Sequence, residues 1–502
     1  MGSSVSSSAS DPAETRQGGG KRTQRLQYRV RSAMWYVTTA WVFGAAWMYV
    51  TSVGAAPTRY GRLLGMSDFQ FGLLAALLSA SAALQLPASY FVERYGFRKS
   101  VLLIAGLVHR ALWLVIALIP WVFPRAWWWP GLVLFMTLSA SFSNISTPGV
   151  LTWFADLIPE RVRGRYFSRR AQFGQAVGLL ATLLVGEVLD WAAPMGEAVL
   201  RRTISILFAA AALSGIADFL TLTRVPDKRH RPDPTLSFWE LLVKPWRDRN
   251  FRWFVGFTAT LNFGLVYVGQ YIWLYAFDAV GMSNRQANLM LMVVPIVVGL
   301  GAYPLWGKIV DRWGCKATLL VAGVLISHGA AAWIFVTRDS WWLGYSAAVV
   351  AMVAWPGVDL ASFSLLLRLG GSEGGRRQGS AYIAANSVVV AAAGLLSGLF
   401  GGTMAKLFGD WQGTLLGYPL TYHGLLFLVS GALRLLALAW LLGLREPQPQ
   451  PTLVAVRYIV GELYSNMQHA VFMPVRRLIR LGRWAYTLSR WRLLRPLLRL
   501  LR

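Results

Sequence analysis

Two short segments of the chain combine an acidic residue with basic residues and glycine at matching positions. In the first, Glu93 is followed by Arg94, and in the second Asp311 is followed by Arg312. A carboxylate at one helix end can face the positive N-terminus of another helix, and glycine permits tight turns and close helix approach. The two segments therefore predict contacts between helix ends. Their other residues of interest are Ser89, Gly96, Arg98 and Lys99 in the first segment and Gly307, Gly314 and Lys316 in the second.

Residues that could form an active site are scattered along the chain. The single cysteine, Cys315, excludes an intramolecular disulfide, and the sequence contains no phosphate-binding glycine loop. No histidine pairs with a cysteine or a carboxylate at the spacing of metal ligands. We therefore expect neither an enzyme nor an ATP-driven pump, and no metal or cofactor. The five histidines are His109, His230, His328, His423 and His469.

Asp359 is the residue best placed to carry a proton. It follows the pair Pro356-Gly357 by two residues, and a helix broken there would leave backbone carbonyls free. A carboxyl group in apolar surroundings takes up a proton more readily than one in water. Asp359 is therefore the predicted proton-coupling residue. The alternative is a structural ion pair with an arginine such as Arg110.

The elements that position these residues follow from composition. The chain has 502 residues, of which 55% are hydrophobic and 14% charged, and its mean hydropathy is +0.46. Globular proteins carry about 25% charged residues, and a helix needs about 20 apolar residues to cross a bilayer. The sequence contains twelve such segments and predicts an all-α polytopic membrane protein. They lie near residues 32–56, 69–92, 100–122, 130–155, 171–193, 203–223, 253–277, 286–308, 317–336, 343–367, 379–405 and 423–443.

The longest internal polar stretch, residues 225–252, separates six spans from six. We expect one six-helix bundle at 32–224 and a second at 253–443, joined by this stretch as a cytoplasmic loop. Residues 1–31 are predicted to be a disordered basic tail, because they lack the apolar core of a signal peptide. Residues 444–502 are predicted to be a basic amphipathic tail, either an interfacial helix or a poorly ordered segment near the membrane.

The net charge of +27 is distributed unevenly. Most lysines and arginines lie in alternate loops and in the two tails, which is the positive-inside pattern. The charge therefore sets orientation and does not indicate nucleic-acid binding. Both termini are predicted to be cytoplasmic, in a bacterial inner membrane. We expect the basic loops and the C-terminal tail to bind anionic lipid headgroups.

The two halves of the chain resemble each other. Gly96 corresponds to Gly314 at an offset of 218 residues, and Pro148 corresponds to Pro356 at an offset of 208. Further matches occur in the same order, which indicates duplication. Two parallel six-helix repeats are a recurrent design of secondary transporters.

The two segments with paired charges also resemble a known signature. Residues 307–316 resemble the G-x-x-x-D-R/K-x-G-R/K-R/K loop of the major facilitator superfamily, and residues 89–99 resemble a second copy. That family places its copies between spans two and three and between spans eight and nine, as here. The resemblance covers residues 32–443. In the first copy Ser89 replaces the glycine and Glu93 replaces the aspartate.

This resemblance implies a fold of twelve helices in two pseudo-symmetric six-helix bundles, with a gating latch at the cytoplasmic ends. It implies that Asp311 faces the start of span five near Ser168, and that Glu93 faces the start of span eleven near Gly379. Arg94 and Arg98 are expected to pair with Asp156. Such contacts favour the outward-open state and break when the cytoplasmic side opens. The alternative is that these charges only anchor the topology.

In the same family, spans 1, 4, 7 and 10 line a central cavity. Polar residues within spans usually face a cavity or a partner, although each alone can instead form a helix–helix hydrogen bond. As a group, the candidates suit a polar or amphipathic organic solute. They are Trp41, Trp47, Ser141, Ser143, Asn144, Asn262, Tyr267, Gln270, Tyr271, Trp355 and Asp359.

The resemblance implies a secondary transporter whose bundles rock around a midplane site and move a small solute, possibly with protons. We expect a monomer. Span four has no arginine and span five no Gly-Pro pair, which disfavours a drug/proton antiporter. Glu187 and Asp190, near the outer end of span five, are interpreted as outer-surface or outer-gate groups. The alternatives are a transporter-like sensor that binds without moving its solute, and a membrane-embedded enzyme.

Overall fold

The computed structural model describes residues 12–52, 54–158, 160–226, 237–371, 376–415, 417–446, 454 and 456–459. This part of the chain is almost entirely helical, because a backbone in lipid must satisfy its own hydrogen bonds. The first-half helices are α1 (Pro12–Thr51), α2 (Ala55–Leu63), α3 (Asp68–Ser81), α4 (Gln85–Tyr95), α5 (Arg98–Val122), α6 (Trp128–Leu157), α7 (Glu160–Ala192) and α8 (Glu197–Thr223). Short 3-10 turns η1 (Ala82–Leu84), η2 (Arg125–Trp127) and η3 (Ala193–Met195) join some of them.

The second half repeats this pattern. Its helices are α9 (Phe238–Val243), α10 (Arg249–Leu274), α11 (Asn284–Asn288), α12 (Val294–Trp313), α13 (Cys315–Ala331), α14 (Leu343–Gly371), α15 (Arg376–Phe408) and α16 (Tyr422–Gly443). The connecting turns are η4 (Lys244–Arg247), η5 (Tyr275–Ala279), η6 (Leu289–Val293) and η7 (Ala332–Phe335), of which η5 and η6 are π-helical. An antiparallel hairpin of β1 (Gln412–Leu415) and β2 (Tyr418–Thr421) precedes α16.

The predicted twelve transmembrane helices are confirmed. Within the described residues, nine helical segments are long and apolar enough to cross a membrane. One of them joins α3, η1 and α4, and another joins α11, η6 and α12. The three other long helices, α1, α6 and α10, are spans one, four and seven. They are less apolar because they carry polar residues such as Asn144, Asn262 and Gln270.

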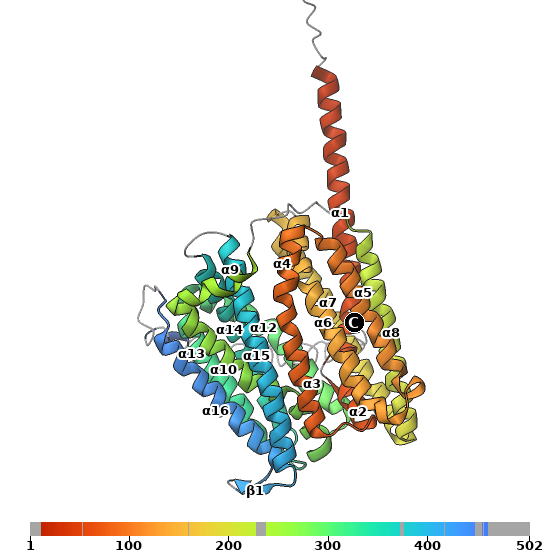
Figure 1. Cartoon of the computed structure of the whole chain (residues 1–502), viewed down its shortest axis with the longest axis vertical. Helices are drawn as coiled ribbons and strands as arrows, with labels where there is room; N and C mark the ends of the chain where they lie inside the picture. Colours follow the sequence, from red (N-terminus) through yellow and green to blue (C-terminus); the bar gives the residue numbers. More distant parts are fainter. Residues whose placement is uncertain are drawn as a thin grey trace, which may run out of the picture.

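Helix boundaries differ from the expected ones in three places. Helix α1 begins at Pro12, so residues 12–31 are helical where the sequence analysis placed a disordered tail, and in Figure 1 its start protrudes from the bundle. Span one ends at Thr51 and is followed by the separate helix α2. The stretch 225–252 contains α9 and η4. Only 444–446, 454 and 456–459 of the C-terminal tail lie among the described residues, so its expected helix falls outside them.

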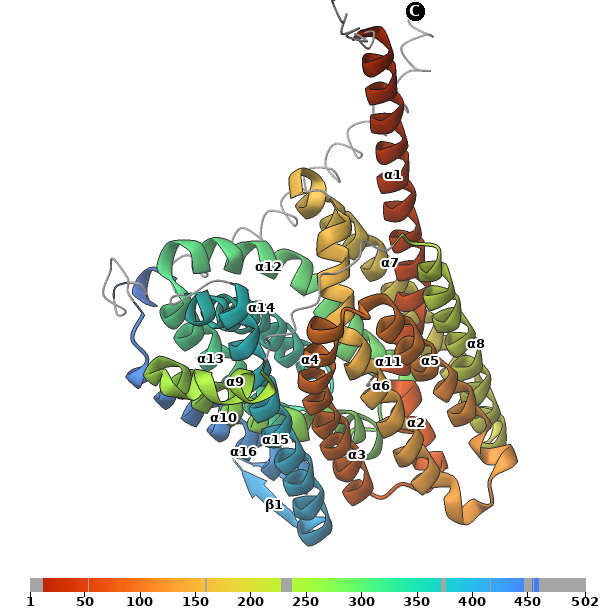
Figure 2. The ribbon, with the colours of Figure 1, turned by 45° about the horizontal axis from the view of Figure 1, so that its top comes forward.

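The helices gather in two bundles, one for each half of the chain (Figures 1 and 2). In the first bundle α1 packs on α8, and α5 packs on α6 and α8. The second bundle repeats these contacts as α10 on α16, and α13 on α14 and α16. The same pairing in both halves is the structural expression of the duplication seen in the sequence.

The loops with paired charges also repeat their geometry. Gly96 ends α4 with φ 76° and Gly314 separates α12 from α13 with φ 84°, a backbone region that suits glycine. The Nζ of Lys99 donates to the carbonyls of Thr223 and Val225 at 3.0 and 2.7 Å. Likewise, Lys316 Nζ donates to the carbonyl of Leu444 at 2.8 Å. Each lysine thus neutralises the C-terminal end of the last helix of its bundle. We call this end of the bundles the motif end, and the opposite end the distal end.

Helices α3 and α15 form the closest contact between the bundles. A Cβ added at Gly398 would lie 2.3 Å from the backbone nitrogen of Ala76, and one added at Gly72 would lie 2.5 Å from the Cα of Gly402. Glycine at these positions lets two backbones approach as in other membrane helix pairs. The crossing holds the halves together on the distal side of the membrane midplane.

Candidate functional site: a cavity beneath a distal gate

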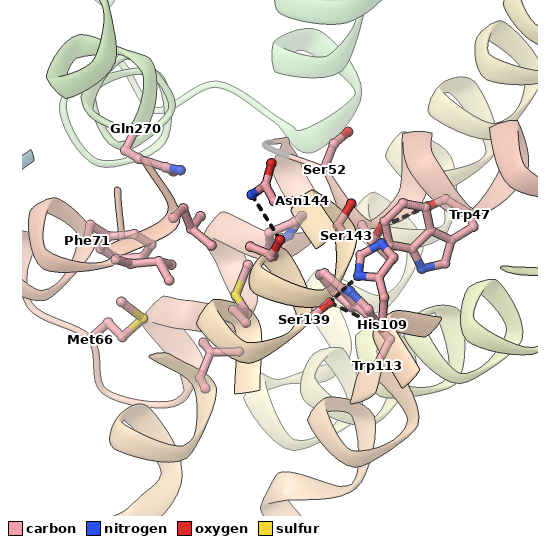
Figure 3. A pocket seen from close by; sticks show the side chains of 17 residues that line it. Trp47, Ser52, Met66, Phe71, His109, Trp113, Ser139, Ser143, Asn144 and Gln270 are labelled. Atoms are coloured by element: carbon pink, nitrogen blue, oxygen red, sulfur yellow. Dashed lines mark hydrogen bonds between the residues drawn. The ribbon is translucent and has the colours of Figure 1, made fainter. Parts of the chain in front are cut away.

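A cavity of about 290 Å³ lies mainly within the first bundle, and we call it the N-half cavity (Figure 3). Its walls come from α1, α2, α3, α5 and α6, and Gln270 of α10 adds a side chain from the second bundle. The cavity therefore lies where both halves can contact one ligand. Its lining residues are Trp47, Thr51, Ser52, Pro57, Met66, Phe71, Leu74, Leu78, His109, Trp113, Leu132, Met136, Ser139, Ala140, Ser143, Asn144 and Gln270.

Four of the predicted cavity residues line this space: Trp47, Ser143, Asn144 and Gln270. The amide of Asn144 is fixed by its neighbours. Its Nδ2 donates to Ser81 Oγ at 2.9 Å and to the carbonyl of Ala140 at 3.0 Å, and its Oδ1 accepts from Gln85 at 2.7 Å. A carbonyl oxygen has two lone pairs, so Asn144 Oδ1 can accept one further hydrogen bond from a solute.

The other predicted cavity residues lie elsewhere. Asn262 donates to the carbonyl of Val390 at 2.9 Å, and the fully buried Tyr267 donates to the carbonyl of Leu426 at 2.8 Å. The guanidinium of Arg170 lies 4.3 Å from the Trp41 ring centroid, and the hydroxyl of Tyr271 donates to the carbonyl of Asp68 at the distal end. Trp355 lines a second cavity, and Ser141 donates to the carbonyl of Thr137 in its own helix.

A buried polar network lies behind the N-half cavity, and its aspartate, Asp218, was missed by the sequence analysis. Arg110 Nη1 lies 3.2 Å from His109 Nε2, and Arg110 Nη2 donates to Asp218 Oδ2 at 3.3 Å. His109 Nδ1 lies 2.7 Å from Ser139 Oγ, as Figure 3 shows. Because arginine only donates hydrogen bonds, His109 Nε2 is the acceptor. The ring proton is therefore on Nδ1 and points to Ser139.

This buried polar network could have been predicted from the ionisable residues that lie within membrane spans. His109 and Arg110 lie in the middle of α5, and Asp218 lies in α8. Intramembrane charges of opposite sign usually pair. The guanidinium of Arg110 also lies 3.4 Å from the ring centroid of Trp47, a cation–π contact that links the ion pair to the cavity wall.

Asp359 forms a hydrogen bond with Tyr303 and not the ion pair with Arg110 that the sequence analysis considered. The hydroxyl of Tyr303 donates to Asp359 Oδ2 at 3.1 Å, and the carboxylate is exposed. The alternative ion pair of Asp359 with Arg110 is wrong, because Arg110 pairs with Asp218. Asp359 is thus not buried in the protein interior, and it lines neither of the two cavities described here.

The motif end holds the residues of the predicted latch. Asp311 is exposed, and within the described residues it forms no hydrogen bond or ion pair. Arg98 is buried, and Glu93 and Arg94 are half-buried. The side chain of Asp156 lies outside the described residues. The expected contact of Asp311 with the start of α7 stays a prediction, because the side chains of residues 159–165 lie outside the described ones.

The distal end, in contrast, is closed by charges that cross between the bundles. Arg62 follows α1 in the first bundle and contacts Asp278 of the second at 2.6 Å, as well as Asp68 of its own bundle. The carboxylate of Asp68 also accepts from Tyr422, and its backbone carbonyl accepts from Tyr271 at 2.9 Å. Burial lowers the pKa of Arg62, but the charges of Asp68 and Asp278 outweigh it, so the pKa is raised overall.

A second cross-bundle contact involves Asp190 at the end of α7. Its carboxylate accepts from the backbone nitrogens of Asn284 and Arg285 at 2.8 and 3.0 Å, and from the Asn284 side chain at 2.8 Å. It thereby caps α11 across the bundle interface. Arg59 donates to Asn284 Oδ1 at 3.0 Å, and Glu187 pairs with Arg285 at 3.1 Å. We call Arg59, Arg62, Asp68, Asp190, Asp278 and Asn284 the distal gate.

Comparison with known proteins agrees with this architecture. The chain is similar in structure to the nucleoside transporter NupG, with 14% identity and a TM-score of 0.59 over 83% of this chain and 99% of that one. It is also similar to a bacterial homologue of the human lysosomal transporter Spinster in an inward-facing, unoccupied conformation. The identity is 15% and the TM-score is 0.56, over 87% of this chain and 98% of that one. A third similar structure is a D-xylose–proton symporter, with 17% identity and a TM-score of 0.55 over 84% of this chain and 97% of that one.

At these identities the structural likeness establishes the fold alone. A search of curated proteins finds no significant match. The sequence model of the Major Facilitator Superfamily matches residues 36–397, which is more than half of the chain. The chain is therefore a membrane protein that belongs to the major facilitator superfamily.

Proposed function

We propose that this protein is a secondary active transporter that moves a small organic solute by alternating access of two rocking bundles. The observation that carries the proposal is a cavity lined from both halves, beneath a charged gate that joins the halves at the distal end. The N-half cavity receives Gln270 from the second bundle, and the Arg62–Asp278 and Asp190–Asn284 contacts cross between the bundles at the distal end.

The proposed orientation places the motif end and both termini in the cytoplasm of a bacterial inner membrane. The positive-inside rule supports it, since Lys99 and Lys316 lie at the motif end with most of the basic loops. With that orientation, a closed distal gate and an exposed Asp311 correspond to an inward-facing state. On this proposal, Asp311 engages the start of α7 only when the distal gate opens.

The chemistry of the N-half cavity favours a solute with an apolar ring face and polar edge groups. Trp47, Trp113 and Phe71 offer aromatic surfaces, while Asn144 and Gln270 offer amides. A volume of about 290 Å³ corresponds to roughly ten non-hydrogen atoms, taking about 30 Å³ for each water-sized group.

We further propose that the protein acts as a monomer and that its basic loops and C-terminal tail bind anionic lipid headgroups. Each lysine or arginine near an anionic membrane surface contributes about 1 kcal/mol of attraction. The net charge of +27 supplies many such contacts.

The test begins with thermal unfolding of the detergent-purified full chain in the presence of sugars, nucleosides, amino acids, organic acids and cationic compounds. A ligand at 100 times its Kd raises the free energy of unfolding by about 2.7 kcal/mol. Each ligand found is then offered to proteoliposomes. Concentrative uptake supports the transporter, whereas binding without uptake or exchange contradicts it and favours the sensor.

The cavity assignment is tested with Asn144→Ala. Loss of one hydrogen bond to the ligand should lower its affinity about two- to tenfold. The matched control is Thr221→Ala, whose hydroxyl donates only to the carbonyl of Ala217 in its own helix. Equal affinity in both variants would place the solute elsewhere.

Asp359 is the proposed coupling residue, supported by its exposure and its hydrogen bond from Tyr303. Uptake driven by a proton gradient should be lost in Asp359→Asn, while exchange of solute across the membrane without a gradient persists. Gradient-driven uptake that survives the substitution excludes Asp359 from coupling.

A further inference from the structure

The guanidinium of Arg434 is a buried positive charge within the membrane-spanning helix α16. Its residue is only 6% exposed. Arg434 Nη1 donates to the carbonyl of Ile326 at 3.1 Å, and Nε donates to the carbonyl of Gly264 at 3.4 Å. Within the described part of the chain no carboxylate pairs with it. A buried charge without a counter-ion is costly in a membrane interior, so this arrangement favours an anion from outside the chain.

Arg434 borders a second cavity of about 290 Å³, which we call the C-half cavity. The walls come from α10, α12, α13 and α14 and are otherwise apolar, with Ile272, Met352 and the indoles of Trp333 and Trp355 among them. Arg434 is the one charged residue among its described lining residues. Arg434 Nη2 hydrogen-bonds no described residue, so this nitrogen remains available to a ligand.

The two cavities are related by the internal duplication, so their lining residues can be compared position by position. Asn144 of the N-half cavity corresponds to Met352 of the C-half cavity, at the offset of 208 residues that relates Pro148 to Pro356. In the first bundle, the buried arginine is neutralised by Asp218. The C-half cavity is thus apolar at a position where the N-half cavity is polar. Its lining arginine, at a different position of the repeat from Arg110, has no carboxylate partner among the described residues.

We propose that the C-half cavity binds a small monocarboxylate with an apolar body. Its carboxylate accepts a charge-assisted hydrogen bond from Arg434, and its body lies between Trp333 and Trp355. One negative charge balances the single guanidinium, and the volume accommodates roughly ten non-hydrogen atoms. The inference goes beyond the proposed transport, because it requires binding alone.

The experiment is calorimetric titration of the detergent-purified full chain with phenylacetate. Phenylacetamide, which has the same size and no charge, is the second probe, and hexadecanoate, which exceeds the cavity, is the third. Phenylacetate is expected to bind saturably, and the other two are not. Binding of phenylacetamide with the same affinity would overturn the role of the charge. Binding of hexadecanoate with equal or higher affinity would overturn the assignment to a small acid.

Variants locate the site. Arg434→Gln should weaken phenylacetate about ten- to a hundredfold, the ratio for a lost charge-assisted hydrogen bond, and Arg434→Lys should retain most of the affinity. Because Arg434→Gln could disturb folding, Ala348→Leu fills the same cavity without touching the arginine. Its matched control is Val350→Leu, on the exposed face of the same helix.

The expected pattern is loss of phenylacetate binding in Ala348→Leu and retention in Val350→Leu. Equal affinity in both variants, or in Arg434→Gln and the unmodified chain, overturns the inference. Transport is measured separately. Uptake of another solute without phenylacetate binding would reject this binding site but keep the proposed transport function. Phenylacetate binding without uptake of any solute would support the binding site but reject the proposed transport function.

Discussion

Arg110 shows how single side chains decide what an intramembrane charge does. Three groups surround its guanidinium: Asp218 at 3.3 Å, His109 Nε2 at 3.2 Å and the face of Trp47 at 3.4 Å. The carboxylate cancels the charge, and the indole covers it towards the cavity. The pair is therefore a structural element that shapes the cavity wall and sets the tautomer of His109.

The first prediction follows from this pairing. Replacing Asp218 alone, as Asp218→Leu, leaves a buried arginine without a counter-ion and should cost about 3–5 kcal/mol of stability. The double variant Asp218→Leu with Arg110→Met removes both charges and should recover most of the loss. Thermal unfolding of the purified chain measures both, with Glu197→Ala, an exposed acid at the start of α8, as the control. A double variant as unstable as the single one would refute the pairing.

Residue-level predictions from the sequence succeeded where the cause is local. The turns at Gly96 and Gly314 follow from the residue type itself and have the positive φ expected. The partner of Arg110 was not predictable in the same way, because Asp218 is 108 positions away. Pairing across that distance depends on which helix faces meet, and one sequence does not contain that information.

Among elements, the crossing of α3 and α15 shows what the glycines contribute. The backbones approach so closely that a methyl group at Gly398 would lie 2.3 Å from a nitrogen of α3. Hydropathy predicts both helices correctly as spans, because a long apolar run has few alternatives. It does not predict that they touch, nor that span one ends at Thr51 and is followed by α2.

The second prediction concerns this crossing. Gly398→Ala should force the helices apart and cost about 1–3 kcal/mol through overpacking. The matched control is Gly301→Ala in α12, where an added Cβ meets nothing within 4 Å and alanine should gain up to about 1 kcal/mol of helix propensity. Thermal unfolding should thus move in opposite directions for the two variants. A change in unfolding temperature of the same sign and size in both variants would mean that the crossing is not tightly packed.

Seen as a whole, the molecule has two halves of the same design, and their charged contacts among the described residues gather at the distal end. The duplication, the span count and the family were predictable because each leaves a repeated mark on the sequence. The conformational state was not predictable, since one sequence must allow both the state with a closed distal gate and the state with a closed latch at the motif end. In this structure the gate is formed, through Arg62, Asp68 and Asp190, and Asp311 is exposed.

The last prediction tests whether the distal gate controls this state. The carboxylate of Asp190 makes three hydrogen bonds to the start of α11. Because it also faces the positive end of that helix, Asp190→Ala should shift the equilibrium towards outward opening by about 1–2 kcal/mol, or about five- to thirtyfold. A cysteine introduced as Ser143→Cys in the N-half cavity reports the shift through its labelling by an impermeant maleimide applied from outside.

The native Cys315 is fully buried, so labelling of the unmodified chain gives the background. Glu197→Ala in the same Ser143→Cys chain is the control, since it removes an exposed acid at the distal end without touching the gate. Faster labelling in Asp190→Ala alone means that the cap on α11 holds the distal end closed. If both variants label at the rate of the parent, closure depends on the glycine crossing of α3 and α15, and the ionic gate follows it without controlling it.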